Sequence, residues 1–258
     1  MDFSSTPQDG TAATRPARGR PPRLDQRRTV ETALGLLDEA GLDALTMRRL
    51  AEAMGVQAGA LYRYFATKQD LLTAMAEHML AGCAEVADDG AAWDEQVAGL
   101  ARRMRAALLA HRDGARVYAG THSTGTNTLG FADALIGLLR KAGFGAEDAP
   151  RAAFTLVNFT TGHTLEEQAA LEGPGNAATG PDADRLREAV AATPGRFPHV
   201  EAALPTLTSS DFAAQFEFGL RLLLQGMSAL RAPAHSPLSG HRTGPGRRPP
   251  CAGTWREG

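Results

Sequence analysis

The sequence is poor in the residues on which metal sites, disulfide frameworks and membrane spans depend. It has two cysteines, Cys83 and Cys251, which show no metal-ligand spacing and are too few for a disulfide framework. No apolar run approaches the roughly 18 residues needed to span a membrane. The first residues, MDFSSTPQDG, lack the charged start and the apolar core of a signal peptide. These absences predict a cytoplasmic protein with no membrane partner.

Aromatic residues are also scarce, and neither sign of charge is in large excess. Aromatics make up 6% of the chain, whereas Ala, Leu and Gly are abundant. This balance favours packed helices, because a sheet needs more Val, Ile, Tyr and Thr. The 27 basic and 29 acidic residues leave a net charge of −2, which argues against a histone-like polycation. Since no segment shows the alternation of a strand, we predict an all-α fold.

Catalytic motifs are absent as well. The chain has no nucleophile elbow, phosphate loop, His-x-x-x-His zinc motif or redox cysteine pair. His163 and Glu167 would share one helix face, but nothing else in the sequence supports a metal site there. We therefore predict no catalytic residue, no metal and no cofactor. An enzyme is kept only as an unfavoured alternative, which turnover without DNA affinity would support.

Helical periodicity dominates the chain between two tails. Residues 1–23 and 232–258 have little to bury, so we expect both to be disordered. Residues 173–182 predict a loop, and residues 193–208, which contain three prolines, predict a second irregular stretch. Periodicity, caps and glycine stops predict helices over the following ranges: 25–40, 47–54, 58–64, 68–86, 93–110, 113–120, 127–142, 149–171, 182–192 and 209–230.

The segment 45–65, LTMRRLAEAMGVQAGALYRYF, is the most informative part of the sequence. Two short helical patterns are separated by Gly55 and Val56 at helix-turn-helix spacing. Gly55 can adopt the positive φ that a tight turn between crossed helices needs. Val56 and Leu61 are placed to fill the angle between the helices. The small residues 58–60 leave room for the second helix to approach base edges, so the segment predicts a DNA-reading unit.

This segment resembles the DNA-binding domain of the TetR family of transcriptional regulators. The resemblance implies an N-terminal three-helix helix-turn-helix domain over 24–70. It also implies a C-terminal helical domain over 71–231 that binds a ligand and dimerises. The residues that carry it form a long, ordered set: Leu45, Thr46, Arg48, Leu50, Ala51, Gly55, Val56, Leu61, Tyr62, Phe65, Lys68, Leu71 and Leu72.

The resemblance implies a role for each polar residue of this unit. Thr46, Tyr62 and Lys68 would contact phosphates and set the register on DNA. Arg48 could reach guanine O6 and N7 with two guanidinium nitrogens. Further groove contacts are expected from Gln57, Ala58, Gly59, Ala60, Arg63 and Tyr64. The alternative is that these charges form an ordinary solvated face.

A basic arm precedes the first helix. Residues 15–28 hold six arginines and a single acid, Asp25. The run Arg18-Gly19-Arg20-Pro21 resembles the core of an AT-hook, so Arg18 and Arg20 could enter the minor groove of A·T-rich flanks. A flexible tail with diffuse attraction to phosphate is the alternative, and the sequence leaves both open.

Three C-terminal segments, 107–122, 160–170 and 211–227, extend the resemblance to the tetracycline-repressor subclass. In that subclass the drug arrives with a divalent metal held by a histidine, and Tyr118 stands at the matching position. A neutral phenol is a poor magnesium ligand. We therefore predict a ligand other than magnesium–tetracycline.

The resemblance implies a ligand cavity at the same place as in that subclass, but lined by different residue types. Thr121 and Glu166 match positions that touch the metal's waters, whereas Leu100, Met104 and Ala134 replace polar drug contacts. An aromatic natural product suits such a site better. The alternative is that the apolar residues are plain core and both histidines are structural. The predicted ligand-binding residues are Leu100, Met104, Tyr118, Leu135 and Phe159 in the wall and Thr121, His122, His163 and Glu166 as polar groups.

The two long helices at 149–171 and 209–230 carry more apolar surface than one face needs. The resemblance implies that they pair with their copies as a four-helix homodimer interface, although some of this surface could be buried within one chain. Two-fold symmetry then predicts a palindromic operator with half-sites roughly 34–36 Å apart. The apolar residues concerned are Phe154, Val157, Leu165, Phe212, Phe216, Leu220, Leu223 and Leu224.

The resemblance as a whole implies a nucleoid-associated repressor that a small-molecule inducer releases from double-stranded DNA. The helix expected at 68–86 would join each DNA-binding head to the core and tilt when ligand binds. An activator and a ligand-independent architectural DNA-binding protein are the alternatives, because the sequence contains neither the operator nor the regulated gene.

Overall fold

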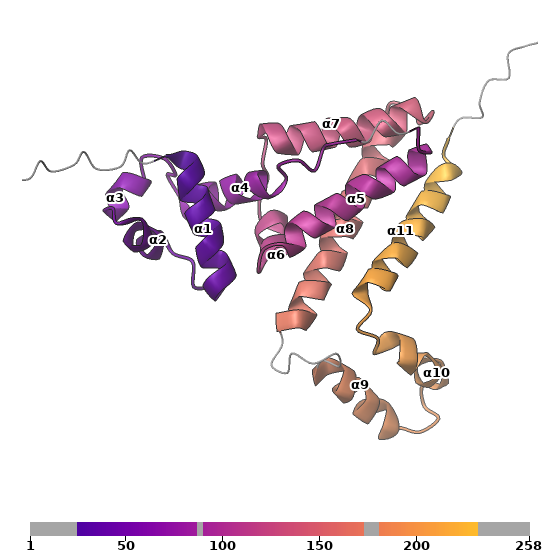
Figure 1. Cartoon of the computed structure of the whole chain (residues 1–258). Helices are drawn as coiled ribbons and strands as arrows, with labels where there is room; N and C mark the ends of the chain where they lie inside the picture. Colours follow the sequence, from indigo (N-terminus) through magenta and orange to yellow (C-terminus); the bar gives the residue numbers. More distant parts are fainter. Residues whose placement is uncertain (1–24, 87–89, 173–180, 232–258) are drawn as a thin grey trace, which may run out of the picture.

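The computed structural model describes residues 25–86, 90–172 and 181–231, and every regular element in these ranges is a helix. The predicted all-α fold is confirmed. The tails predicted to be disordered lie outside the described residues. No helix in these ranges is long and apolar enough to cross a membrane. The helices are α1 Gln26–Ala40, α2 Met47–Met54, α3 Ala58–Leu61, α4 Lys68–Met79, α5 Trp93–Leu109, α6 Gly114–Ala119, α7 Thr126–Lys141, α8 Asp148–Glu172, α9 Pro181–Ala191, α10 Pro198–Leu207 and α11 Phe212–Ser228 (Figure 1).

Helices α1, α2 and α3 form a small head at one end of the molecule (Figure 1). The carboxylate of Asp25 accepts a hydrogen bond from the Arg27 N–H at 3.3 Å and caps α1. The hydroxyl of Thr46 accepts one from the Arg49 N–H at 3.1 Å and caps α2. Gly55 ends α2 in the left-handed conformation, with φ +65°. The predicted turn between crossed helices is therefore confirmed.

Apolar packing fixes the crossing of these short helices. Leu61 is fully buried between them, and Val56 packs against the same core. Burying one such side chain stabilises the fold by about 1.5–3 kcal/mol, so packing outweighs the weak propensity of short helices. The buried residues of the head include Val30, Ala33, Leu34, Leu37, Leu45, Leu50, Ala51, Leu61 and Phe65.

Helix α4 leads from the head into the rest of the chain (Figure 1). It begins with a reciprocal capping box formed by Thr67 and Asp70. It ends at Met79, so the prediction of a helix to residue 86 is wrong. Leu80 and Cys83 are buried, but they reach the core from turns around Gly82, whose φ is +77°. Apolar periodicity alone did not distinguish these turns from another helical turn.

Helices α5, α6, α7 and α11 form a body around α8. Helix α8 contacts α5, α6, α7 and α11, and α6 also contacts α4. The core between these helices is built from aliphatic and aromatic side chains that include Leu100, Met104, Leu108, Leu135, Leu139, Phe144, Leu156 and Phe216. The body therefore meets the head through α4 and α6.

Helices α9 and α10 contact each other and extend below the body (Figure 1). The irregular stretch predicted for 193–208 is wrong, since most of it is α10. Pro198 sits in the first turn, where the N–H it lacks is not needed by the helix. Pro205 falls in the last turns of α10, where it removes one helical hydrogen bond without preventing the helix from reaching Leu207. The predicted loop at 173–182 ends earlier than expected, because α9 begins at Pro181; residues 173–180 lie outside the described part.

Candidate nucleic-acid interface and sensing core

The predicted reading residues lie on the surface of the head. Arg48, Gln57 and Arg63 are exposed, and Tyr62 and Tyr64 keep 51% and 45% of their surface accessible. A tyrosine offers both an apolar ring and a hydroxyl that can bond a phosphate oxygen. The three residues that follow α3, Tyr62, Arg63 and Tyr64, are therefore all exposed on the head.

Helix α3 is a single turn, Ala58–Leu61, and residues 62–64 continue it as a turn instead of the helix predicted to 64. Ala58 and Ala60 are half-buried, and Gly59 between them is exposed. A Cβ added at Gly59 would meet no atom within 4 Å. Glycine costs a helix about 1 kcal/mol relative to alanine. No neighbour among the described residues therefore requires a glycine at position 59.

Three charged or hydroxyl side chains of the reading face already have partners. Thr46 caps α2, as described above. Arg48 Nε donates to Glu52 at 2.9 Å, and both side chains are largely exposed, so this ion pair is weak and easily exchanged. Half-buried Lys68 donates from Nζ to the Leu42 carbonyl at 3.3 Å. An ammonium has three N–H donors, so this bond does not use all of them. Arg18 and Arg20 lie outside the described residues.

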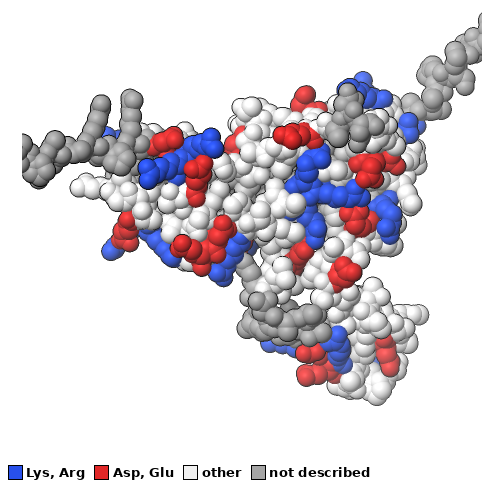
Figure 2. All heavy atoms as spheres, in the orientation of Figure 1, with Lys and Arg blue, Asp and Glu red and all other residues white. Residues whose placement is uncertain are grey.

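Charges of both signs are mixed on the face of the molecule that Figure 2 shows. Figure 2 shows basic and acidic side chains interspersed over the visible face of the head and the body. The near-neutral total charge agrees with this pattern. Contact with DNA would therefore depend on a few positioned side chains of the head more than on a broad positive field.

The apolar residues predicted to wall a ligand site lie in the core of the body. Leu100, Met104 and Leu135 are fully buried, and Tyr118 and Phe159 are half-buried and pack against the same core. They come from α5, α6, α7 and α8. Burial raises the pKa of the Tyr118 phenol, and nearby Cys83 adds to the shift. Tyr118 is thus a neutral phenol.

The polar residues predicted for the same site are divided between the interior and the surface. The Thr121 hydroxyl is half-buried and donates to the Tyr118 carbonyl at 3.0 Å. Both ring nitrogens of His163 are buried and have no hydrogen-bond partner. His122 and Glu166 are exposed on the single chain. The structure thus places two of the four polar candidates against the core.

His163 is surrounded by aromatic rings. Its ring centroid lies 5.9 Å from that of Phe159, 6.3 Å from that of Phe212 and 5.4 Å from that of Phe216. Burial lowers the pKa of His163, and the opposing effect of Glu167 does not cancel it. The imidazole is therefore neutral at pH 7 between α8 and α11.

A nearby ion pair was missed by sequence reasoning. Arg105 of α5 forms two hydrogen bonds with Glu167 of α8, at 2.9 and 2.7 Å, and both side chains are mostly buried. The guanidinium also lies over the Phe216 ring, 5.1 Å from its centroid. The two partners are far apart in sequence, so no local pattern could have paired them.

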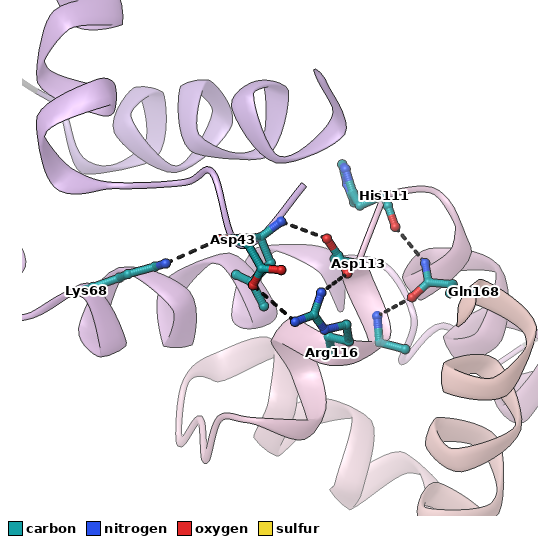
Figure 3. Close-up of polar contacts among 8 residues, drawn as sticks. Asp43, Lys68, His111, Asp113, Arg116 and Gln168 are labelled. Carbon is teal, nitrogen blue, oxygen red and sulfur yellow. Dashed lines mark hydrogen bonds and ion pairs between the residues drawn. The ribbon is translucent and has the colours of Figure 1, made fainter. Parts of the chain in front are cut away.

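Two separate sets of polar contacts hold the turn between α5 and α6, and Gln168 of α8 makes the first (Figure 3). Its buried side chain accepts a hydrogen bond from the Ala115 N–H at 2.9 Å. Its amide nitrogen donates to the carbonyls of Leu108 and His111, at 3.2 and 2.8 Å. One side chain of α8 therefore holds the end of α5 and the start of α6.

Asp113 makes the second set of contacts, which binds the same turn to the head (Figure 3). It is buried and has the left-handed φ of +56°, which a short polar side chain tolerates better than most. Its carboxylate accepts from the Leu42 N–H at 2.7 Å and from Arg116 at 2.6 Å. Arg116 also pairs with Asp43 at 3.3 Å. The pair Asp113-Gly114 is visible in the sequence as a turn signal, but its partners in the loop between α1 and α2 are not.

Helices α8 and α11 leave an apolar surface uncovered on the single chain. Phe154 is 70% exposed, Phe218 57% and Leu222 54%. Two of the apolar residues that the sequence offered for this surface are buried within the chain: Phe216, which stacks on Phe159 at 5.4 Å, and Leu220. They follow the alternative that the sequence left open, because α11 packs its Phe216 face against α8.

No three His, Cys, Asp or Glu side chains gather into a potential metal site within residues 25–86, 90–172 and 181–231. The one cysteine in these ranges, Cys83, is buried, and burial raises its pKa.

Two protein-family models match the chain. The model of bacterial regulatory proteins of the tetR family matches residues 30–75, and the tetracyclin repressor-like C-terminal domain matches residues 86–231. The tetracycline repressor protein class A from transposon 1721 of Escherichia coli is 39% identical over 213 residues, which cover 81% of this chain and 93% of that repressor. The chain belongs to the TetR family. The resemblance noted in both halves of the sequence is confirmed.

Solved structures of TetR family proteins share the fold of this regulator. A possible TetR family transcriptional regulator from Streptomyces coelicolor A3(2) is 67% identical, with a TM-score of 0.74 over 80% of this chain and 100% of that one. ActR of Streptomyces coelicolor, solved in complex with actinorhodin, is 34% identical, with a TM-score of 0.72 over 80% of this chain and 98% of that one. This TetR family regulator thus has an N-terminal helix-turn-helix DNA-binding domain and a C-terminal ligand-binding domain.

Proposed function

We propose that this regulator is a homodimeric repressor that binds a palindromic operator and is released from it by a small aromatic molecule other than magnesium–tetracycline. It would act in the cytoplasm, on the nucleoid. Residues 24–70 would read DNA, and residues 71–231 would sense the ligand and dimerise. The observation that carries the proposal is the turn between α5 and α6, which Gln168 binds to the sensing body and Asp113 binds to the reading head.

The reading role rests on what the head exposes. Tyr62, Arg63 and Tyr64 follow α3 directly and are all exposed, and Arg48 is held only by a weak surface pair. Gly59 has no steric reason within the chain to be glycine. Close approach of α3 to base edges would supply that reason. Thr46 and Lys68 would fix the register through phosphates, and Gln57 would add a groove contact.

The homodimer rests on the apolar surface of α8 and α11. Phe154, Phe218 and Leu222 form exposed apolar area on two long helices, which would bury it by packing against their copies. A two-fold axis through this bundle would present two heads to successive major grooves, roughly 34–36 Å apart. The operator would therefore be an inverted repeat.

The nature of the ligand rests on the residues near Tyr118. A neutral phenol there, with Leu100 and Met104 from α5, offers an apolar wall with few polar groups. A metal-chelated drug would need a stronger ligand than a phenol. ActR, which is similar over 80% of this chain, was solved with actinorhodin. These observations favour an aromatic molecule.

The proposed switch uses the junction between body and head. Ligand binding near Tyr118 would favour a second arrangement of α6 and α4, and the heads would then lose the spacing of the operator. Linkage requires that operator DNA weaken ligand binding by the same factor. Arg116 and Asp113, which connect α6 to the loop before α2, would carry this change.

The central test is selection of bound duplexes from a random pool by the full chain, followed by release of the selected duplex. Actinorhodin is the aromatic probe, and magnesium–tetracycline is the comparison. We expect inverted repeats in the selected pool and release by the aromatic probe alone. Absence of any duplex preference at modest ionic strength would overturn the reading role. A complex that no aromatic compound releases would favour an architectural DNA-binding protein, whereas turnover without DNA affinity would favour an enzyme.

Tyr118→Ala tests the ligand site separately. We expect the affinity for the releasing compound to change and the operator affinity to stay that of the parent. Equal ligand affinity in variant and parent would remove Tyr118 from the site.

The arm is tested by Arg18→Ala combined with Arg20→Ala. If these arginines enter the minor groove, the double variant binds more weakly and its affinity depends less on salt, because fewer counterions are released. Unchanged binding at low and high salt would assign no DNA contact to the arm.

A further inference from the structure

The side chain of Glu77, near the end of α4, is bound by the start of α7. Its carboxylate accepts four hydrogen bonds: from the Ser123 hydroxyl at 2.9 Å, from the Asn127 N–H, from the Thr128 N–H at 3.1 Å and from the Thr128 hydroxyl at 2.6 Å. The Asn127 side chain donates in turn to the Glu77 carbonyl at 3.0 Å. One residue of α4 thus holds both the first turn of α7 and the segment before it.

Glu77 takes the place of the cap that α7 lacks. The residue at the cap position is Gly125, which has no side chain to accept the free N–H groups of the first turn. A carboxylate at the N-terminus of a helix also interacts favourably with the helix dipole. A Cβ at Gly125 would overlap the Glu77 carboxylate, so the glycine makes room for it. The capping group of α7 therefore comes from a different helix, about 50 residues earlier in the chain.

The Glu77 carboxylate is charged, and hydrogen bonds stabilise its charge. Partial burial acts to raise the pKa of Glu77, but the hydrogen bonds from Thr128, Asn127 and Ser123 outweigh it and lower the pKa. Among the described residues, no Lys, Arg or His forms an ion pair with Glu77. These donors therefore stabilise its charge, and moving α4 away from α7 would remove all of them together.

Helix α4 also holds the other end of the same segment. Gln69, in its first turn, donates to the carbonyl of Gly120 at 2.7 Å. The segment 120–128 is thus bound to α4 at both ends. Between these ends lie Thr121 and His122, two of the polar residues assigned to the ligand site. Movement of this segment therefore acts on α4 at two points about two turns apart.

We propose that Glu77 is the positioning residue that passes the state of segment 120–128 to the reading head through α4. The inference rests on the proposed function, since it takes ligand binding near Tyr118 as the event that moves this segment. Because Glu77 cannot keep its donors unless α4 follows α7, the helix shifts with the segment. Its first turn then carries the movement to Lys68 and the head.

Hydrogen exchange of the full chain, measured without ligand or DNA, tests this inference in Glu77→Gln. The matched control is Glu85→Gln, because Glu85 is an exposed glutamate with no side-chain hydrogen bond among the described residues. We expect the Asn127 and Thr128 amides to exchange about tenfold faster in the first variant, since a neutral amide replaces a charged acceptor. The increase extends along α4 to its first turn and to residues 41–46. The control exchanges as the parent does.

A second variant approaches the same contact from the other side. In Gly125→Ala the new Cβ displaces the Glu77 carboxylate, so this variant reproduces the exchange pattern of Glu77→Gln. Faster exchange confined to residues 123–130 in both variants would reduce Glu77 to a local cap and overturn the inference. Parent-like exchange at residues 127 and 128 would overturn it as well.

Operator binding separates this inference from the proposed function. With a duplex selected by the parent, Glu77→Gln is expected to change affinity about tenfold, while Glu85→Gln leaves it unchanged. If the parent selects no duplex, the proposed function fails, and the spread of exchange along α4 still decides the role of Glu77.

Discussion

The head and the body of this regulator differ in how far along the sequence the residues that cap their helices lie from those helices. In the head, Asp25 and Thr46 each cap the helix that follows directly, and Thr67 does the same at the start of α4. Helix α3 of the head has no side-chain cap, and α11 of the body is capped locally by Asp211. In the rest of the body, α5, α6 and α7 have no side-chain cap of their own. The first turn of α7 is bound by Glu77 of α4, and that of α6 by Gln168 of α8.

This difference has a consequence for signalling. The caps of α1 and α2 lie within the head, so they do not depend on the position of the body. The first turns of α6 and α7 are held by α8 and α4, so neither of these pairs of helices can separate without losing hydrogen bonds. The head is therefore suited to act as a rigid reader and the body to act as a switch.

The largest expected effect concerns the proposed dimer surface on α11, without which each DNA-binding head would act alone. Phe218→Asp with Leu222→Asp places two charges on the exposed apolar face of α11 and should leave a folded monomer. Losing the second head should lower operator affinity by about a hundredfold or more, because bivalent binding is lost. Sedimentation velocity and fluorescence anisotropy measure the two outcomes. Leu129→Asp, also at an exposed leucine but on α7, is the control. A dimer that persists in the double variant would move the interface elsewhere.

The second prediction concerns a variant that breaks the contact between head and body. Asp113→Ala leaves the Leu42 N–H and the Arg116 guanidinium without their buried acceptor, so the free energy of unfolding should fall by about 2–3 kcal/mol. Asp43→Ala removes an 89% exposed partner of the same arginine and should cost less than about 0.5 kcal/mol. Urea denaturation compares the two. Equal losses would show that Asp113 is no more important than a surface charge.

The third prediction concerns the pH dependence of the contact between α4 and α7. The pKa of Glu77 is lowered in the fold, so its contribution to stability is complete above the unfolded pKa near 4.5 and is lost as pH falls through the folded pKa. Glu77→Gln should therefore be less stable than the parent by about 1–2 kcal/mol at pH 7. The difference should shrink below pH 4.5. A difference that stays constant between pH 7 and pH 3 would contradict a role for the charge.

The smallest effect is expected within the head. Thr46→Ala removes the cap of α2 and should cost about 1 kcal/mol, while Thr46→Ser keeps the hydroxyl and should cost much less. Hydrogen exchange should rise in the head and stay unchanged in α5, α7 and α8. A rise that spread into the body would mean that the head is less independent than its local caps suggest.

Sequence predictions that rest on neighbouring residues were confirmed, whereas those that depend on packing between distant helices were less accurate. The turn at Gly55 and the cap at Thr46 were predicted because both depend on residues within one helical turn. The end of α4 was placed too late, because the buried residues Leu80 and Cys83 continue the apolar pattern outside a helix. The sequence left open whether Phe216 packs within the chain or against a partner, since its apolar pattern does not say which surface covers it. Of the polar ligand candidates, His122 and Glu166 are exposed on the single chain.

The sequence by itself determined the all-helical class, the family and the turn at Gly55, and it placed most of the helices but not α10. These depend on periodicity and on capping bonds that span at most a few residues. Only the tertiary structure decided that Glu77 caps α7 and that Asp113 holds Leu42, contacts that join residues 50 and 71 positions apart. A buried polar group takes whichever partner the packing of the helices brings to it, so such a contact has no signature in the neighbouring sequence.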